Sequence, residues 1–316
     1  MALDPKARGL LDMVQRVGVP RFHELDVPQA RRASEKLLFA FRPDAPPVAS
    51  VTEVPIGRRD GSVLMARLYR PLQATSGQVL PLLVFYHGGG WCVGDVPSYD
   101  VVCRELANGA GCAVLSVEYR LAPEHPFPAA FDDALLAPDW AMEHADLLEI
   151  DPERVALGGD SAGGTLLLGV ALAWRDRAGV SPLRYLAAIY PCTEIRSNRP
   201  SRETYGDGYF LDRDTLRWFF ERYLPNGESE DWRASPMRAE SLAGLPAMTL
   251  VTAGCDPLTD DCLAFAERAQ AEGVTVRHHR YDGMVHGFFT LGGYFPQANV
   301  AVAQVAADLS EALSAT

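Results

Sequence analysis

The feature of this sequence that most limits its possible folds is an alternation of short apolar segments with longer amphipathic ones. After residue 80, apolar runs of strand length alternate with segments whose apolar residues recur at helical spacing. Strands are expected at 80–86, 112–119, 154–157, 186–190, 248–253 and 274–281, and helices at 100–109, 129–136, 164–178, 262–272 and 296–313. Strands that alternate with helices predict an α/β fold with a mostly parallel sheet and helices on both faces.

The N-terminal part of the chain precedes this alternation. Helices are expected there at 5–17 and 28–41, and a connector at 42–48. Strands are expected at 51–56 and 63–69. The connector contains three prolines. Arg58-Arg59-Asp60-Gly61 stands between the two strands and is typical of a hairpin turn. A helical pair and a hairpin are therefore expected before the main sheet.

One later segment interrupts the alternation. Residues 194–225 contain no expected strand but are rich in aromatic residues: Tyr205, Tyr209, Phe210, Trp218, Phe219, Phe220 and Tyr223. The segment forms either an extra helical layer with its own small core or a lid over a pocket. We favour the lid, because an insertion after a central strand lies near the carboxyl edge of the sheet, where ligands bind. The sequence thus predicts one domain over 1–316, with cap elements at about 1–45 and 194–225.

Gly159-Asp160-Ser161-Ala162-Gly163 is the motif with the clearest chemistry. It follows an expected strand and opens a helix of small apolar residues. This is the setting of a nucleophile elbow, in which a sharp turn exposes the serine hydroxyl and leaves no room for side chains at the glycines. The alternatives are a glycine-rich packing turn and a phosphate loop, but the phosphate loop lacks its lysine, since Thr165 follows Gly164. Ser161 is the candidate nucleophile.

A second glycine motif stands at the end of the strand at 80–86. In His87-Gly88-Gly89-Gly90-Trp91, consecutive glycines allow the backbone to approach a substrate closely. Acyl transfer builds negative charge on a carbonyl oxygen, and buried N–H groups stabilise that charge. We expect the amides of Gly88, Gly89 and Ala162 to form this oxyanion hole. His87 precedes the nucleophile, so it is interpreted as an anchor of the loop.

The base and the acid of a catalytic triad should follow the nucleophile in this fold. His278 and His279 lie inside an expected strand, whereas His286 stands between the last strand and the last helix. His286 is therefore the candidate base. Asp256 ends the strand at 248–253 and is the leading candidate for the orienting acid, with Asp260 as the runner-up. This triad requires no metal and no organic cofactor.

The motifs together resemble the hormone-sensitive lipase family of esterases, also called family IV of lipolytic enzymes. The matching residues are His87-Gly88-Gly89-Gly90-Trp91, Tyr119-Arg120-Leu121-Ala122-Pro123-Glu124, Gly159-Asp160-Ser161-Ala162-Gly163-Gly164, Asp256-Pro257-Leu258 and His286-Gly287-Phe288. The resemblance implies an α/β-hydrolase fold with an eight-stranded sheet, a helical cap, and hydrolysis of short- to medium-chain acyl esters. It also implies a possible homodimer. We expect five residues near these motifs to bind the substrate: Trp91, Asp160, Tyr190, Phe210 and Val285.

Composition excludes several other classes of function. The chain has 29 basic and 41 acidic residues, and this balance argues against nucleic acid as a partner. The first twenty residues lack the apolar core of a signal peptide, and the uncharged run at 161–174 is too short to span a bilayer. Six cysteines lie far apart without a Cys-x-x-Cys pair, so no metal site is expected. These observations predict a cytoplasmic protein with reduced cysteines.

Two other functions fit the same fold. A non-catalytic receptor for a small ligand typically lacks one triad member, whereas all three are present here. An amidase would use the same nucleophile, base and oxyanion hole. Cys92 and Cys255 place thiols beside the catalytic loops and are interpreted as packing residues, and Pro138 is expected to interrupt a helix.

Overall fold

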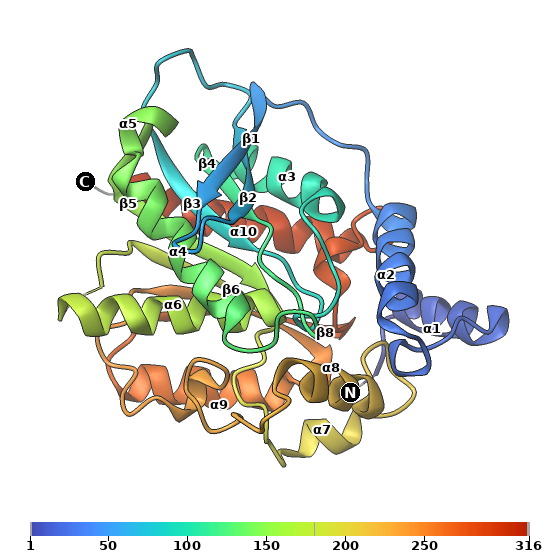
Figure 1. Cartoon of the computed structure of the whole chain (residues 1–316). Coiled ribbons are helices and arrows are strands. Elements are labelled where there is room, and N and C mark those ends of the chain that lie inside the picture. Colours follow the sequence, from blue (N-terminus) through green and yellow to red (C-terminus); the bar gives the residue numbers. More distant parts are fainter. Residues whose placement is uncertain (1, 180, 315–316) are drawn as a thin grey trace.

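The computed structural model describes residues 2–179 and 181–314, and a single sheet forms its centre (Figure 1). The strands are β1 (Ser50–Gly57), β2 (Val63–Arg70), β3 (Leu80–Tyr86), β4 (Ala113–Val117), β5 (Ile150–Asp160), β6 (Tyr185–Ile189), β7 (Met248–Cys255) and β8 (Val276–Val285). Their order in the sheet is β1-β2-β4-β3-β5-β6-β7-β8. Pairing is antiparallel from β1 to β4 and parallel from there to β8. The predicted fold class is confirmed: the sheet is eight-stranded and mostly parallel.

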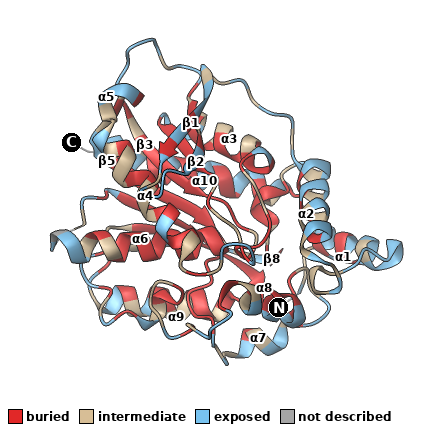
Figure 2. Cartoon of the chain, in the orientation of Figure 1, coloured by how far each residue is buried: buried red, intermediate tan, exposed pale blue. Residues whose placement is uncertain are grey.

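Helices cover both faces of the sheet. One face packs against α4 (Ala129–Glu143), α6 (Ala162–Ala178) and α9 (Thr259–Ala271), and the other against α3 (Asp100–Ala110) and α10 (Pro296–Ser314). Figure 2 shows the buried strands between these helices, of which α6 is itself largely buried. No helix in the described part of the chain is long and apolar enough to cross a membrane.

The central strand β3 shows why this part of the chain becomes a sheet. Its side chains point alternately to the two faces, because successive residues of a strand face opposite sides. Leu82, Val84 and Tyr86 enter the core under α4 and α6, whereas Leu83 and Phe85 enter the core under α3 and α10. Both faces are buried, and this explains the continuous apolar run of the sequence.

Four helices and a short 3₁₀ turn lie together on one side of the molecule (Figure 1). They are α1 (Pro5–Val17), η1 (Phe22–Glu24), α2 (Val27–Phe41), α7 (Pro200–Thr204) and α8 (Arg213–Tyr223). The N-terminal and the inserted segments contact each other directly. The rings of Phe22 and Phe219 lie 5.9 Å apart, and His23 Nδ1 lies 3.1 Å from Thr215 Oγ1. Residues far apart in the sequence thus form one helical layer.

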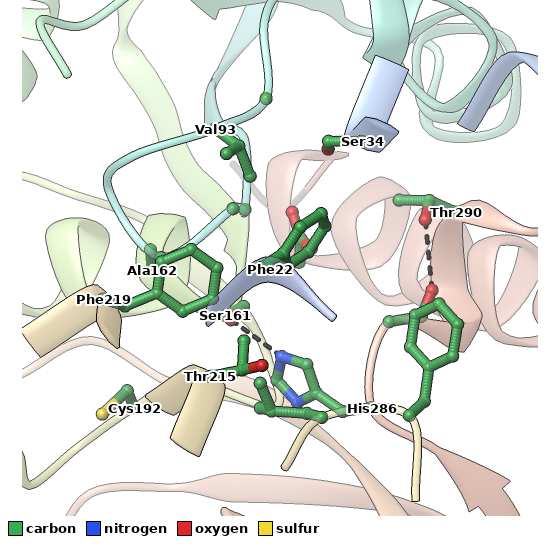
Figure 3. A pocket seen from close by; sticks show the side chains of 18 of the residues that line it. Phe22, Ser34, Val93, Ser161, Ala162, Cys192, Thr215, Phe219, His286 and Thr290 are labelled. Carbon is green, nitrogen blue, oxygen red and sulfur yellow. Dashed lines mark hydrogen bonds between the residues drawn. The ribbon is translucent and has the colours of Figure 1, made fainter. Parts of the chain in front are cut away.

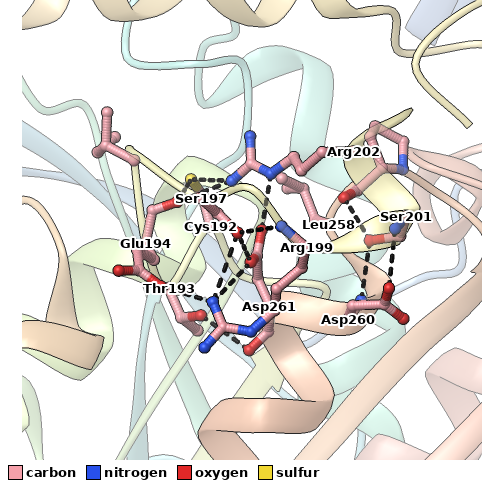
Figure 4. A network of polar contacts seen from close by, with 12 residues as sticks. Cys192, Thr193, Glu194, Ser197, Arg199, Ser201, Arg202, Leu258, Asp260 and Asp261 are labelled. Atoms are coloured by element: carbon pink, nitrogen blue, oxygen red, sulfur yellow. Dashed lines mark hydrogen bonds and ion pairs between the residues drawn. The ribbon is translucent and has the colours of Figure 1, made fainter. Parts of the chain in front are cut away.

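The start of the inserted segment is fastened to α9 by a buried carboxylate (Figure 4). The side chain of Asp261 is fully buried. It accepts hydrogen bonds from Arg202 Nε at 2.7 Å and from Arg199 Nη1 at 3.2 Å. Arg199 also pairs with Glu194 at 2.6 Å. Because a buried carboxylate needs such partners, this network fixes where the insertion leaves the sheet.

The remaining elements are short. They are η2 (Pro97–Tyr99), α5 (Ala145–Leu148), η3 (Pro236–Arg238) and η4 (Phe288–Thr290).

The expected interruption at Pro138 does not occur, since α4 continues through it. A proline inside a helix leaves the carbonyl four residues earlier without its intrahelical donor. That carbonyl belongs to Ala134, and it accepts a hydrogen bond from Tyr86 Oη at 2.7 Å. A buried hydroxyl from β3 therefore replaces the missing donor. The prediction of a broken helix is wrong because the sequence does not reveal this tertiary contact.

Candidate active site

The nucleophile elbow lies between β5 and α6. Ser161 has φ 52° and ψ −116°, a backbone conformation that is strained for a residue with a side chain. The neighbouring glycines permit this turn. A Cβ at Gly163 would lie 1.9 Å from the carbonyl oxygen of Tyr86, and one at Gly159 would lie 2.7 Å from the backbone of Gly163. Only glycine fits at both positions, so the elbow forms as the motif predicts.

Ser161, His286 and Asp256 form a continuous hydrogen-bonded chain. His286 Nε2 lies 2.8 Å from Ser161 Oγ (Figure 3), and His286 Nδ1 lies 2.7 Å from Asp256 Oδ2. Asp256 is fully buried and His286 is 8% exposed. Since the carboxylate can only accept, the imidazole donates from Nδ1 and leaves Nε2 to accept the serine proton. This is the geometry that general-base activation of a serine requires.

The other candidates for base and acid are engaged elsewhere. Asp260 Oδ2 accepts from the backbone N–H of Ser201 at 2.8 Å, so the runner-up carboxylate holds the start of α7 (Figure 4). His278 Nε2 lies 2.8 Å from Thr252 Oγ1, and His279 Nε2 lies 2.8 Å from Asp308 Oδ2. The structure brings neither histidine to Ser161. β8 extends to Val285, so His286 follows the strand directly.

The glycine loop after β3 differs from the prediction in one respect. The N–H of Gly88 donates to Tyr99 Oη at 2.9 Å and is not available to a substrate. Gly89 and Gly90, with φ +117° and +57°, have N–H groups without an acceptor among the hydrogen bonds of the described residues. Ala162 begins α6, and the N–H groups of a first helical turn have no intrahelical acceptor. The expectation that the Gly88 amide contributes to an oxyanion hole is therefore corrected, and the free amides of the loop are those of Gly89 and Gly90.

A small cavity of about 110 Å³ opens beside Ser161. Most of its wall is apolar and comes from η1, α2, α8 and the loops that follow the strands: Phe22, Leu37, Leu38, Val93, Phe210, Leu211, Leu216, Phe219, Phe220, Leu258 and Leu291. Figure 3 shows how several of these side chains surround Ser161 and His286. The hydroxyl-bearing residues of the wall are Ser34, Tyr99, Thr215 and Thr290, together with Ser161 itself. The cavity therefore suits a ligand that is apolar away from the reacting atoms.

Three of the five expected substrate-binding residues line this cavity: Trp91, Asp160 and Phe210. The other two do not. Tyr190 is fully buried, and its ring packs 4.6 Å from the ring of His286. Val285 is fully buried in the core at the end of β8. Both residues lie behind the histidine, so the expectation that they contact the substrate is corrected.

Comparison with known proteins identifies the family of the chain. The sequence profile of a family described as alpha/beta hydrolase fold matches residues 83–290, which include the glycine loop and all three triad residues. The chain belongs to the hormone-sensitive lipase family of α/β hydrolases. The resemblance to this family that the five sequence motifs indicate is confirmed.

Members of this family and its fold are similar to the chain over almost its full length. Ethyl acetate hydrolase of Pseudomonas putida is 35% identical and covers 99% of this chain and 100% of its own. Carboxylic ester hydrolase LipN of Mycobacterium tuberculosis is 39% identical over 92% of this chain and 79% of its own. A crystal structure of an alpha/beta hydrolase enzyme from the metagenome of Lake Arreo has a TM-score of 0.93 and 38% identity, and covers 98% of both chains.

The thiols near the catalytic loops of this family member are inert packing groups. Cys92 is fully buried, and burial raises the pKa of its thiol to about 12. Burial also raises the pKa of Cys255. Cys192 lines the cavity, and burial raises the pKa of its thiol to about 11. Because the thiolate is the reactive form, the raised pKa values argue against all three thiols as nucleophiles.

His87 acts as an anchor in this family member, as the sequence predicts. Its ring is fully buried and stacks on Tyr119 with 4.3 Å between the centroids. Its Nδ1 lies 2.7 Å from the carbonyl oxygen of Gly88. Within residues 2–179 and 181–314, no three side chains of His, Cys, Asp or Glu are grouped so that they could hold a metal ion.

Proposed function

We propose that this protein is a carboxylic ester hydrolase that cleaves short- to medium-chain acyl esters through an acyl-enzyme intermediate. One observation carries the proposal. The Ser161–His286–Asp256 hydrogen-bonded chain stands at the wall of an apolar cavity, next to the free amides of Gly89, Gly90 and Ala162. A nucleophile, its base and donors for an oxyanion are the groups that ester hydrolysis requires.

In the first half of the reaction, Ser161 Oγ attacks the ester carbonyl carbon while His286 Nε2 takes its proton. Asp256 holds the imidazole through Nδ1 and stabilises its positive charge. The carbonyl oxygen becomes negative and accepts hydrogen bonds from the amides of Gly89, Gly90 and Ala162. His286 then gives its proton to the departing alcohol oxygen, and the acyl group stays on Ser161.

In the second half, water repeats the attack. His286 takes a proton from the water as its oxygen adds to the acyl carbon, and the same amides stabilise the negative charge. His286 then returns the proton to Ser161 Oγ, which leaves as the acid is released. The steps need only groups of this chain and one water molecule.

The size and lining of the cavity support a short, apolar acyl group. Its volume of about 110 Å³ is well below that of sites for drug-sized ligands, which measure roughly 300–1,000 Å³. The name of the Pseudomonas putida relative, ethyl acetate hydrolase, refers to a small ester as well. We further propose that the segments at about 1–45 and 194–225 act as a cap, since Phe22 and Phe219 come from these segments and line the cavity.

The test is hydrolysis of p-nitrophenyl acetate, butyrate and octanoate by the purified protein. We expect turnover of the short esters, loss of at least about 10⁴-fold in Ser161→Ala, and full activity in Ser62→Ala, an exposed serine of the hairpin turn. A fluorophosphonate probe should label the wild type at Ser161. Absence of both turnover and labelling would indicate a receptor instead, and faster cleavage of matched amides than of esters would indicate an amidase.

A further inference from the structure

Asp160 is a buried carboxylate beside the nucleophile that the proposed mechanism does not use. Asp160 is 3% exposed. Its Oδ2 accepts a hydrogen bond from Tyr99 Oη at 3.0 Å, and its Oδ1 has no partner among the described residues. Burial raises the pKa of Asp160 to about 6, although the hydrogen bond from Tyr99 opposes this rise. The group is thus ionised at neutral pH in a place where a charge destabilises the fold.

The hydrogen bonds around Tyr99 connect Asp160 to the glycine loop. Gly88 N–H donates to Tyr99 Oη at 2.9 Å, and the hydroxyl oxygen accepts this bond. The single proton of the hydroxyl must therefore go to Asp160. Such a chain is cooperative, because a hydroxyl that donates to a carboxylate becomes a better acceptor. The negative charge of Asp160 thereby strengthens the hold of Tyr99 on the Gly88 amide.

The packing at this point leaves little freedom. A Cβ at Gly88 would lie 2.4 Å from Asp160 Oδ2 and 2.9 Å from Tyr99 Oη. The peptide between His87 and Gly88 is also held at its other polar end, where Tyr119 Oη donates to the carbonyl oxygen of His87 at 2.7 Å. The next two residues of the chain, Gly89 and Gly90, supply the free amides of the loop. The orientation of this peptide, together with the hydrogen bonds on the carbonyl oxygens of Gly88 and Gly89, thus contributes to where those amides point.

We propose that Asp160, acting through the Tyr99 hydroxyl on the Gly88 amide, is a positioning residue that aims the Gly89 and Gly90 amides at the substrate oxyanion. The inference rests on the proposed ester hydrolysis and assigns a role to two residues outside the triad. It accounts for a buried carboxylate next to Ser161 that takes no part in the proposed proton transfers. It also accounts for the diversion of the first glycine amide away from the oxyanion hole.

The effect should appear in turnover and not in substrate affinity, because an oxyanion exists only in the transition state and the tetrahedral intermediate. In Tyr99→Phe, both hydrogen bonds of the hydroxyl are lost. We expect kcat for p-nitrophenyl butyrate to fall about 10- to 100-fold with KM within about 2-fold. In Asp160→Asn, the amide oxygen still accepts from Tyr99 but the charge is gone. We expect a smaller fall in kcat, of about 5- to 20-fold, since charge-assisted hydrogen bonds are about twice as strong as neutral ones.

Two further variants separate positioning from general loss of packing. Tyr86→Phe is the matched control, because it also removes a buried tyrosine hydroxyl, one that donates to Ala134 in α4. We expect it to lower stability and to leave kcat within about 2-fold. The double variant Tyr99→Phe/Asp160→Asn should be no slower than Tyr99→Phe alone, within about 3-fold, because the two residues act in series.

A trifluoromethyl ketone reports on the oxyanion hole independently. Ser161 Oγ adds to its carbonyl carbon, the proton passes to His286, and the resulting anion occupies the hole. Its inhibition constant should weaken in Tyr99→Phe and Asp160→Asn by the same factors as kcat/KM. Unchanged kcat in both variants, an equal fall in Tyr86→Phe, or a rise in KM alone would overturn the inference.

The wild-type rate in this assay tests the proposed function, and the ratio of the variant rate to the wild-type rate tests the inference. The failure of one can therefore be distinguished from the failure of the other. Should Tyr99→Phe not fold, Asp160→Asn decides the question, because it preserves the shape of the side chain.

Discussion

The carboxyl edge of the sheet and the helical layer beside it are held together by different kinds of contact. At the edge, short directional hydrogen bonds join the functional groups, as between Asp256, His286 and Ser161. In the layer, aromatic contacts are added to polar ones: the tilted rings of Phe22 and Phe219 lie 5.9 Å apart, and the stacked rings of Trp91 and Tyr223, 4.3 Å apart, join the glycine loop to α8. Apolar contacts are non-directional and tolerate exchange of one large side chain for another. We therefore expect the edge to determine the chemistry and the layer to determine which substrate reaches it.

The largest effect should come from the edge, through Asp256→Asn. The substitution keeps the shape of the side chain, but the amide cannot hold the imidazole in the tautomer that accepts the serine proton. We expect kcat/KM for p-nitrophenyl butyrate to fall about 10⁴-fold. Asp260→Asn is the matched control, because Asp260 holds α7 and lies outside the triad, and it should retain activity within about 3-fold. Equal losses in the two variants would contradict the assignment of the acid.

Gly90→Ala tests where the edge and the layer meet. Gly90 has φ +57°, and a Cβ there would lie 2.3 Å from the ring of Phe219. The variant must move the glycine loop or the ring, so we expect kcat to fall about 100-fold, as for loss of one oxyanion donor. Gly57→Ala serves as control, since a Cβ at Gly57 would meet nothing within 4 Å, and its kcat should not change. Wild-type kcat in Gly90→Ala would show that the loop is more adaptable than its contacts indicate.

The same contrast explains how much of the fold could be predicted from the sequence. β3 has the predicted bounds, because burial on both faces makes its apolar run continuous. β5 begins at Ile150 and not at residue 154, and β8 ends at Val285 and not at 281. In β5, Ile150 is buried but Asp151, Pro152 and Glu153 separate it from the apolar run. Most residues of β8 before Met284 are polar, and several are exposed, so no continuous apolar pattern marks either extension. Strand pairing, and not local sequence, extends them.

For the site, the sequence identifies the residues whose roles depend on motif and chain order. Ser161, His286 and Asp256 are of this kind, and the structure brings them together. Motif and chain order do not show which of the three adjacent glycines has a free amide, because this depends on the Tyr99 hydroxyl, eleven positions from Gly88 in the chain. Much of the cavity wall is missed for a similar reason. Leu37 follows the same helical spacing whether it faces a core or a cavity, and Phe22 lies in a short turn outside the expected helices.

Asp160→Asn should also change how stability depends on pH. Asp160 is faced by Tyr99, Tyr190 and His286, and burial raises its pKa from 3.8 to about 6. A raised carboxyl pKa means that the folded state favours the protonated form. The free energy of unfolding of the wild type therefore falls as pH rises from about 4 to 6. Above that range the destabilisation caused by the ionised carboxylate stays constant.

The asparagine variant lacks this pH-dependent destabilisation, because its side chain does not ionise. Its free energy of unfolding relative to wild type should rise between pH 4 and 6, by at most about 3 kcal/mol, and then stay constant. Urea denaturation of both proteins at pH 4, 5, 6, 7 and 8 measures the difference. A difference that is flat from pH 4 to 8 would mean that Asp160 does not titrate in this range.

The smallest effect should come from the layer, through Phe219→Ala. The ring of Phe219 lines the cavity against Gly90, so its removal lengthens the space beside the ester carbonyl. Longer acyl chains would then bury more methylene groups, each worth about 0.8 kcal/mol. We expect the ratio of kcat/KM for octanoate over butyrate to rise about 10-fold, since the new space is only partly filled. Phe39→Ala on the outer side of α2 should leave this ratio unchanged, because Phe39 is outside the cavity wall. If Phe219→Ala instead abolished turnover of all esters equally, the ring would contribute to the chemistry itself. Phe219 would then belong with the catalytic edge and not with the layer that selects substrates.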